Sequence, residues 1–478
     1  MNTELFLQIF IGICLIGLIL SLFFEEWDYL ISSIVIVFIS IIISSLLIPL
    51  DSADDFKEII LAVDWEVIVF LFCIFTIVEI FKHVNFFETI AIQIVNRFYY
   101  TPRKMFYAIC LTSTLIATII EDLSVAIIFV PIMIQACRKM EISPVPYLFG
   151  ITICINIAST LTPFGSAENI IIANYFGLTL YWHLIYLGIY FVCATIITLF
   201  LLDLFVLRRY IKERDTLLFA KSQTNAENIT IFENLDLSKE LDDKIHPDKR
   251  VNESSQVKPL LKSTIEKKVY VKNLIGLIGF IILLGTIPKI IITGPIGLLI
   301  FVLLNPIEKS STKKRPDLSY FLRKIDAKLI YFFICLFILV HILDIIGLVG
   351  KIELLVESWS NHNTIVLTIE IILITSLLSG FLDDAPVTIM FLPIISKLIT
   401  IGHFPSTPLL MGFTLGINLG GNFLPQGAAC DMMTLELARK ANVKGFTYKS
   451  LTLVGGLFAL LHILLGIGYI SIFIKIFL

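Results

Sequence analysis

The sequence predicts an all-α integral membrane protein made of two related transmembrane halves. Of its 478 residues, 57% are hydrophobic and 16% are charged, whereas soluble proteins contain about 25% charged residues. Apolar stretches recur that reach the roughly 20 residues needed to cross a bilayer. Lipid gives the backbone no hydrogen-bond partners, so each stretch is expected to be helical. The expected surroundings are a lipid bilayer, and the net charge of −3 gives no sign of nucleic acid.

Residues 1–50 are expected to form two N-terminal transmembrane helices, over Leu5–Phe24 and Tyr29–Leu50. The first run lacks a basic segment before it and a small-residue cleavage site after it, so it is expected to be a retained helix. The eight cysteines show no paired or metal-ligand spacing, and we interpret them as small buried hydrophobes.

A repeat with a constant offset of 262 residues divides the rest of the chain. The segment EDLSVAIIFVP, Glu121–Pro131, aligns with DDAPVTIMFLP, Asp383–Pro393, and one register then continues without a net gap. Internal repeats of this kind are typical of secondary transporters. The predicted organisation is a first repeat at 58–207, a polar cytoplasmic linker at 208–270, an extra helix pair at 271–306 and a second repeat at 325–478.

The distribution of Lys and Arg predicts that the two repeats are inverted. If the basic clusters face the cytoplasm, Met105–Cys137 is a hairpin that enters from inside, and Thr364–Leu398 is a hairpin that enters from outside. Two hairpins that meet from opposite faces suit alternating access around a central site. The basic clusters are Arg97–Lys104, Arg138–Lys139, Arg208–Arg214, Lys262–Lys272, Lys309–Lys328 and Arg439–Lys444.

Acidic residues occupy both hairpin tips, at Glu121, Asp122, Asp383 and Asp384, with Ser124 close behind the first pair. An ionised carboxylate at membrane depth costs about 3 kcal/mol or more. Four of them at matched positions predict a site for a cation or for protons. The alternative is that the tips lie in a water-filled interface and the acids are only solvated.

Each half also contains a broken helix, at Asn156–Ser166 and at Asn418–Gly427. Proline and glycine interrupt the helix, and unwound backbone at membrane depth is tolerated only beside a protein-enclosed cavity. Freed carbonyls and amide side chains can replace the water around a small cation. Glu168 and Asp431 follow the breaks, where they could either cap the next helix or bind an ion. The candidate residues here are Asn156, Thr162, Pro163, Gly165, Asn169, Asn418, Asn422, Pro425, Gly427 and Asp431.

These motifs resemble those of the ion transporter superfamily, which includes arsenite permeases, citrate transporters, sodium-coupled dicarboxylate symporters and sodium/proton antiporters. TPFGSAENIIIA is similar to the superfamily's Thr-Pro-x-Gly-x-x-x-Asn signature, and GGNFLPQGAACDM resembles its second copy. The likeness covers roughly residues 63–205 and 325–467. Because its members are often dimers, the resemblance also implies a homodimer.

The sequence departs from the dicarboxylate symporters at the tips, where Ser-Asn-Thr is replaced by carboxylates that would repel an anion. Asp431 stands where the second signature usually ends in Asn. We therefore expect a proton-coupled antiporter of a small cation such as Na⁺, with Asp122, Asn156, Asp384 and Asn418 as the Na⁺ ligands. No cofactor is expected beyond the coupling ions Na⁺ or H⁺, and the expected location is the plasma membrane.

Two alternatives remain open. A citrate, dicarboxylate or arsenite permease would use the acids for its coupling ion and the helix N-termini for the anion. An intramembrane enzyme could use paired aspartates, but an enzyme has no need of an inverted repeat, so no enzymatic activity is expected.

Overall fold

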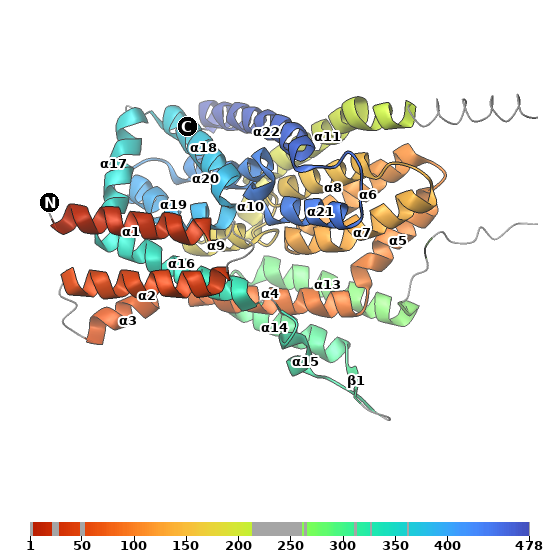
Figure 1. The fold of residues 1–478 in the computed structure, drawn as a ribbon, viewed down its shortest axis with the longest axis horizontal. Helices are drawn as coiled ribbons and strands as arrows, with labels where there is room; N and C mark the ends of the chain where they lie inside the picture. The colour runs from red at the N-terminus through yellow and green to blue at the C-terminus, as the bar shows by residue number, and fades with distance from the viewer. Residues whose placement is uncertain are drawn as a thin grey trace, which may run out of the picture.

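The computed structural model shows a helical membrane protein (Figure 1). It describes residues 3–21, 28–47, 53–212, 261, 265–309, 313–325, 327–360 and 363–477. Most of the predicted linker at 208–270 lies outside these residues. Six of the described helices are long and apolar enough to cross a membrane, or seven if the bent pair α4 and α5 is one span. The chain is an all-α, multi-pass integral membrane protein.

The first half contains the predicted hairpin, α6 and α7, and the predicted broken helix, α8 and α9. A short π-helical turn, Asp203–Leu207, extends its last helix. The helices are α3 (Ala53–Leu61), α4 (Trp65–His83), α5 (Phe86–Phe98), α6 (Pro102–Ala117), α7 (Asp122–Lys139), α8 (Val145–Ala158), α9 (Ala167–Phe176), α10 (Leu180–Tyr186) and α11 (Gly188–Leu202).

The second half repeats this order, with hairpin α18–α19 and broken helix α20–α21. Two 3₁₀ turns, 421–423 and 425–427, lie within the break. A short antiparallel ribbon, β1 (Ile307–Lys309) and β2 (Lys313–Arg315), precedes the second half. The helices are α15 (Leu318–Leu322), α16 (Ala327–Ile345), α17 (Leu348–Ser360), α18 (Thr364–Leu382), α19 (Asp384–Thr400), α20 (Ser406–Gly420), α21 (Ala429–Lys440) and α22 (Tyr448–Phe477).

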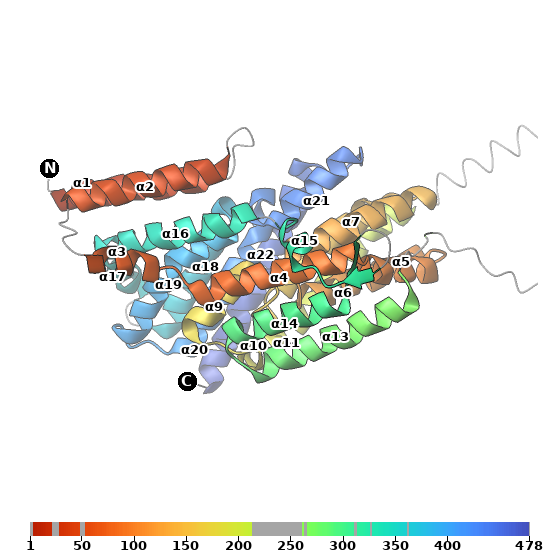
Figure 2. The same cartoon turned by 90° about the horizontal axis from the view of Figure 1, so that it is seen from below.

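Two helix pairs lie outside these halves. The pair before the first half packs on the second half, and the pair between the halves packs on the first. The N-terminal pair, α1 (Thr3–Leu20) and α2 (Tyr29–Leu47), packs on α16. The pair α13 (Lys267–Thr286) and α14 (Ile290–Leu304) adds to the first half, with α14 against α4. Figure 2 shows the two pairs on opposite sides of the molecule. The halves are thus connected by more than the chain between them.

Small residues let α18 and α20 approach closely. A Cβ added at Gly412 would lie 2.7 Å from the Thr368 side chain, and one at Gly420 would lie 2.6 Å from the Cα of Ser376. With Gly416 between them, these glycines recur at every fourth residue, the spacing that lets membrane helices pack backbone against backbone. Because α18 ends at the hairpin tip and α20 ends at the break, this contact fixes the two parts of the site relative to each other.

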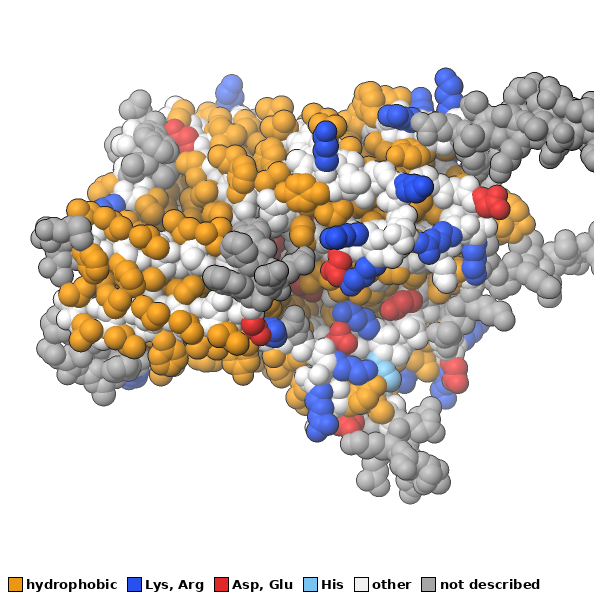
Figure 3. Space-filling model, viewed as in Figure 1, with side chains coloured by type: hydrophobic (Ala, Val, Ile, Leu, Met, Phe, Trp, Pro, Cys, Tyr) orange, Lys and Arg blue, Asp and Glu red, His pale blue; other side chains and the backbone are white. Residues whose placement is uncertain are grey.

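Charged side chains concentrate at one end of the long axis. In Figure 3, Lys and Arg gather over the right half of the view, where Figure 1 places α5, α6, α7 and α21. The left half of the same face, over α1 and α2, is mostly hydrophobic. This distribution suits a molecule whose basic end lies at one membrane surface. The inverted orientation of the two halves stays a prediction.

Candidate functional site

The acids at the hairpin tips lie where each second hairpin helix begins. Helix α7 starts at Asp122 and α19 at Asp384, with Glu121 and Asp383 as the residues before them. Asp383 has a positive φ of 75°, and its side chain accepts a hydrogen bond of 2.7 Å from the Asp384 backbone N–H. Helix N-termini carry partial positive charge, which favours carboxylates at these positions.

The first tip is held by local bonds. Ser124, which is buried, donates a hydrogen bond of 3.0 Å to Oε2 of Glu121. The Asp122 carboxylate accepts from the backbone N–H of Leu123 at 2.6 Å. These bonds orient the two acids at the start of α7.

The second tip is joined to the second broken helix. Ser379 on α18 is bonded to the Asp384 carboxylate and lies 2.8 Å from the backbone carbonyl of Ile417, next to Asn418. Asp384 also lies against Gly421, where a Cβ would be 3.1 Å from the nearer carboxylate oxygen. Ser379 is a small polar residue inside an apolar helix, and no sequence motif marks it.

Both breaks pack on the first hairpin helix of their own half. Thr162 bonds the backbone carbonyl of Thr118, and a Cβ added at Gly165 would lie 2.9 Å from the Ala117 carbonyl oxygen. In the second half, a Cβ at Gly427 would lie 2.9 Å from the Cα of Gly380. The glycines at the same place in the two motifs are therefore required by close backbone approach. Pro163 and Pro425 are buried beside them.

The broken helices cross between the halves in two places. At the first crossing, the amides of Asn169 on α9 and Asn418 on α20 bond each other reciprocally, at 2.8 and 3.2 Å. Asn169 also donates to the Ser159 carbonyl, and Asn418 donates to the Thr414 carbonyl at 2.7 Å. Both amides are buried, and these bonds use the donors and acceptors of both.

The second crossing joins α8 to α21. Nδ2 of Asn156 lies 2.9 Å from Oδ1 of Asn422 and 3.3 Å from Oδ1 of Asp431. Thr152 also donates to that Asp431 oxygen, and the Cys430 thiol donates to Oδ1 of Asn156 at 2.9 Å. Oδ2 of Asp431 and Nδ2 of Asn422 are buried without a hydrogen-bond partner among the described residues.

The offset of 262 residues maps one crossing onto the other. Asn156 corresponds to Asn418, and Asn169 corresponds to Asp431. The pair Asn169 with Asn418 is therefore the counterpart of the pair Asp431 with Asn156. The two crossings differ in one chemical respect, because a carboxylate replaces an amide at Asp431.

Carboxylates from both halves converge around these crossings. Asp122 is within electrostatic range of Asp383 and Asp431, and Glu168 is within range of Asp122 and Asp384. Asp122, Asp384 and Asp431 take part in no ion pair among the described residues. Asp431 does not cap α21, because its carboxyl group bonds the side chains of Thr152 and Asn156, whereas Ser166 caps α9. The centre of the protein is thus rich in carboxyl groups.

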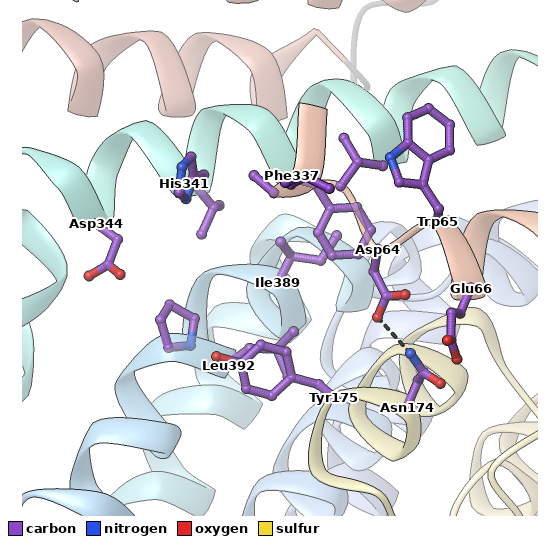
Figure 4. A pocket seen from close by; sticks show the side chains of 15 residues that line it. Asp64, Trp65, Glu66, Asn174, Tyr175, Phe337, His341, Asp344, Ile389 and Leu392 are labelled. Atoms are coloured by element: carbon purple, nitrogen blue, oxygen red, sulfur yellow. Dashed lines mark hydrogen bonds between the residues drawn. The ribbon is translucent and has the colours of Figure 1, made fainter. Parts of the chain in front are cut away.

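A cavity of about 510 Å³ lies between the two halves, next to this centre (Figure 4). Asp64, Glu66 and Asn174 line it from the first half, and His341 and Asp344 line it from the second. Asp64 caps α4 and bonds Asn174 on α9 at 2.8 Å. The lining residues Ile389 and Leu392 follow Asp384 on α19 by five and eight residues, or about 7–12 Å along the helix. On the predicted topology this cavity is an external vestibule.

The structure brings the predicted residues together from four elements, the two tips and the two breaks. Ser379, Thr152 and Cys430 bond the predicted acids and amides but were not predicted from the sequence. In the part of the chain that the structure describes, no three His, Cys, Asp or Glu side chains are arranged to hold a metal ion. A small cation here would need backbone carbonyl and amide oxygens beside a carboxylate, as the unwound segments of transporters provide.

Comparison with known proteins agrees with this architecture. The family model of the citrate transporter matches residues 15–416 and 286–477. The chain is 23% identical to a 46 kDa membrane protein of Mycobacterium leprae over 432 residues, which cover 88% of this chain and 90% of the relative. An uncharacterized transporter of Mycobacterium tuberculosis is 23% identical over 414 residues, covering 85% and 87%.

The P protein of Homo sapiens is 20% identical over 457 residues, which cover 86% of this chain but 54% of that protein. The matches therefore extend over both halves, including the tips, the breaks and the extra helix pair. The chain belongs to the citrate transporter family and is a secondary membrane transporter of that type.

Proposed function

We propose that this protein is an antiporter of the plasma membrane that exchanges a small monovalent cation, Na⁺, for protons. The observation that carries the proposal is the convergence of Asp122, Asp384 and Glu168 within electrostatic range of one another, without an ion pair to Asp122 or Asp384 among the described residues. Carboxylates this close repel when ionised, and binding of either a cation or a proton relieves the repulsion. The two ions then compete for one set of groups.

The hairpin tips supply the charge of the proposed site, and the breaks supply neutral oxygens. Asp384 is connected through Ser379 to the carbonyl of Ile417 near the end of α20, so a cation at this tip has a carboxylate, a hydroxyl and a backbone carbonyl within reach. Groups that interact this strongly titrate as a set, which lets protons leave as Na⁺ enters.

The vestibule fits the same substrate. Asp64, Glu66 and Asp344 line it, and a cavity lined by charge of one sign raises the local concentration of the opposite ion. Lys397 pairs with Asp344 at 2.5 Å, which offsets part of that charge. A cation would approach along α9 and α19 towards the tips.

A second candidate is a citrate permease, and the name of the matching family favours it. In that case the tip acids hold the coupling cation, and the N-termini of α9 and α21, which begin at Ala167 and Ala429, receive the anion. The carboxylates around these N-termini oppose this assignment, because they would repel an unneutralised anion.

The test uses purified protein in proteoliposomes that contain a pH-sensitive dye. Addition of Na⁺ or Li⁺ should move protons, whereas addition of K⁺ or citrate should not. Asp122→Asn and Asp384→Asn should each reduce the Na⁺-driven proton flux at least tenfold. Glu436→Gln is the matched control, because Glu436 is an exposed carboxylate that pairs with Lys440 at the far end of α21. Proton flux driven by citrate alone, or normal Na⁺-driven flux in both tip variants, would refute the proposal.

A further inference from the structure

The vestibule between the halves has an apolar wall that the passage of a small ion does not require. Its volume is about 510 Å³, more than three times the roughly 150 Å³ of a cavity that holds benzene. Phe337, Ile389 and Leu392 are buried and lie between Asp64 at one end and Asp344 at the other (Figure 4). Cavities of this size with mostly apolar walls and a few polar groups are typical of sites for organic molecules.

The carboxylates that line the vestibule differ in their partners. Asp344 pairs with Lys397 of α19 at 2.5 Å. Asp64 accepts a hydrogen bond of 2.8 Å from the neutral Asn174 amide, and neither Asp64 nor Glu66 takes part in an ion pair among the described residues. The start of α4 favours acids at these two positions. Uncompensated negative charge therefore collects at this end of the vestibule.

Aromatic side chains adjoin the same carboxylates. Trp65 and Tyr175 line the vestibule and are 44% and 46% exposed. The indole N–H of Trp65 donates to the carbonyl of Ile60 at 2.9 Å, which holds the ring in one position. A cation near the face of such a ring is attracted by its π electrons. Charge, aromatic rings and an apolar wall thus occur together in one cavity.

A buried polar atom of the lining also lacks a partner. Nε2 of His341 makes no hydrogen bond among the described residues. Water or a ligand normally satisfies a buried nitrogen of this kind. His341 lies on α16 three residues before Asp344, away from the start of α4 (Figure 4). It gives the vestibule a second polar contact, at the far side of the apolar wall.

We propose that the vestibule is a binding site for organic cations that have an apolar body, such as aromatic amidinium ions. The positive charge lies at Asp64 and Glu66, and the ring lies against the apolar wall. Binding itself does not depend on the proposed antiport. One consequence does rest on the antiport: a cation bound here occupies the route along α9 and α19 and obstructs the entry of Na⁺.

Three small probes separate the contributions of ring and charge. Benzamidine has an aromatic ring and a positive charge, benzamide has the ring alone, and acetamidine has the charge alone. Saturation-transfer NMR on the purified protein in detergent, with protein-free micelles as the blank, should give benzamidine a Kd of about 1 mM or lower. The two analogues should bind at least about fivefold more weakly. Absence of benzamidine binding, or equal binding of benzamidine and either analogue, would overturn the proposal.

Two variants test where benzamidine binds. Glu66→Gln removes a charge without an ion-pair partner and should weaken benzamidine binding about threefold, while benzamide binding stays unchanged. Trp65→Leu keeps an apolar side chain and should also weaken benzamidine binding about threefold. Glu436→Gln, at the far end of α21, is the matched control and should bind benzamidine as wild type does. Wild-type affinity in both Glu66→Gln and Trp65→Leu would place the probe outside the vestibule and overturn the proposal.

The consequence for transport is measured separately, as Na⁺-driven proton flux in proteoliposomes. Benzamidine should inhibit the flux of wild-type protein with an inhibition constant close to its Kd, and this constant should rise about threefold in Glu66→Gln. Binding without inhibition would refute the obstruction of the route. If wild-type protein shows no Na⁺-driven flux, the proposed antiport fails, and the NMR result still decides whether the vestibule binds organic cations.

Discussion

Replacement of Gly420 by alanine should separate α18 from α20 and disturb the site between them. The added Cβ would lie 2.6 Å from the Cα of Ser376, about 0.8 Å inside the 3.4 Å of ordinary contact. Because the opposing atom is backbone, no side-chain rotation can relieve the overlap. Overpacking of this kind costs about 1–3 kcal/mol, and the higher helix propensity of alanine returns up to about 1 kcal/mol.

We therefore expect Gly420→Ala to be less stable than wild type by about 1–2 kcal/mol. Thermal unfolding of the purified protein in detergent, followed by a thiol-reactive dye, should show a Tm lower by about 2–5 °C. Transport should fall as well, because Ser379 on α18 bonds both Asp384 and the carbonyl of Ile417 on α20.

Gly468→Ala on α22 is the control, because no atom lies within 4 Å of a Cβ added there. It should leave the Tm unchanged or raise it slightly. Equal Tm values for the two variants would show that α18 and α20 are not in the close contact described here.

Three other changes test separate parts of the structure. Arg103→Gln should lower the Tm, because it leaves the fully buried Asp203 with Tyr107 as its remaining hydrogen-bond partner among the described residues. Asp203→Asn in the same chain should restore part of the Tm, and no restoration would argue against the pair. Asn169→Ala should lower the Tm by an amount equivalent to about 2–3 kcal/mol, since it leaves the buried Asn418 amide without its reciprocal partner, while Asn174→Ala, which loses one bond, should cost less. Asp64→Ala should cost about 1–2 kcal/mol through the lost cap of α4 and the lost bond to Asn174, and Asp64→Asn should recover most of the Tm; equal Tm values for the two Asp64 variants would contradict the capping role.

The hairpins and breaks could be predicted from sequence because their signals are local. Paired acids inside an apolar run mark each tip, and proline with glycine marks each break, as at Pro163 and Gly165. The constant offset then showed that these features occur twice. The structure confirms a helical membrane protein in which each half has a hairpin and a broken helix.

The contacts within the site could not be predicted in the same way, because they join distant parts of the chain. The bond between Asn156 and Asp431 spans 275 residues, and neither residue type specifies the other as a partner. Ser379 and Thr152 look like ordinary small polar residues inside apolar helices. The spacing of Gly412, Gly416 and Gly420 was visible, but only the structure shows that α18 is the helix packed against it.

Several local features also escaped prediction. The bend of 51° between α4 and α5 depends on a left-handed backbone at Asn85, with φ of 54°, a conformation that asparagine adopts more readily than most residues. The β1–β2 ribbon and the π-helical turn at Asp203–Leu207 are short irregularities beside long helices. None of them changes which residues reach the centre.

The two crossings between the halves explain how one of them can contain a carboxylate while the other contains only amides. Each crossing takes one residue from each half, so a dimer of two identical halves would form the same two crossings with identical residues in both. Such a dimer would carry either two carboxylates or none. Joining the halves in one chain permits an acid at Asp431 and an amide at Asn169, and hence a single ionisable crossing per molecule.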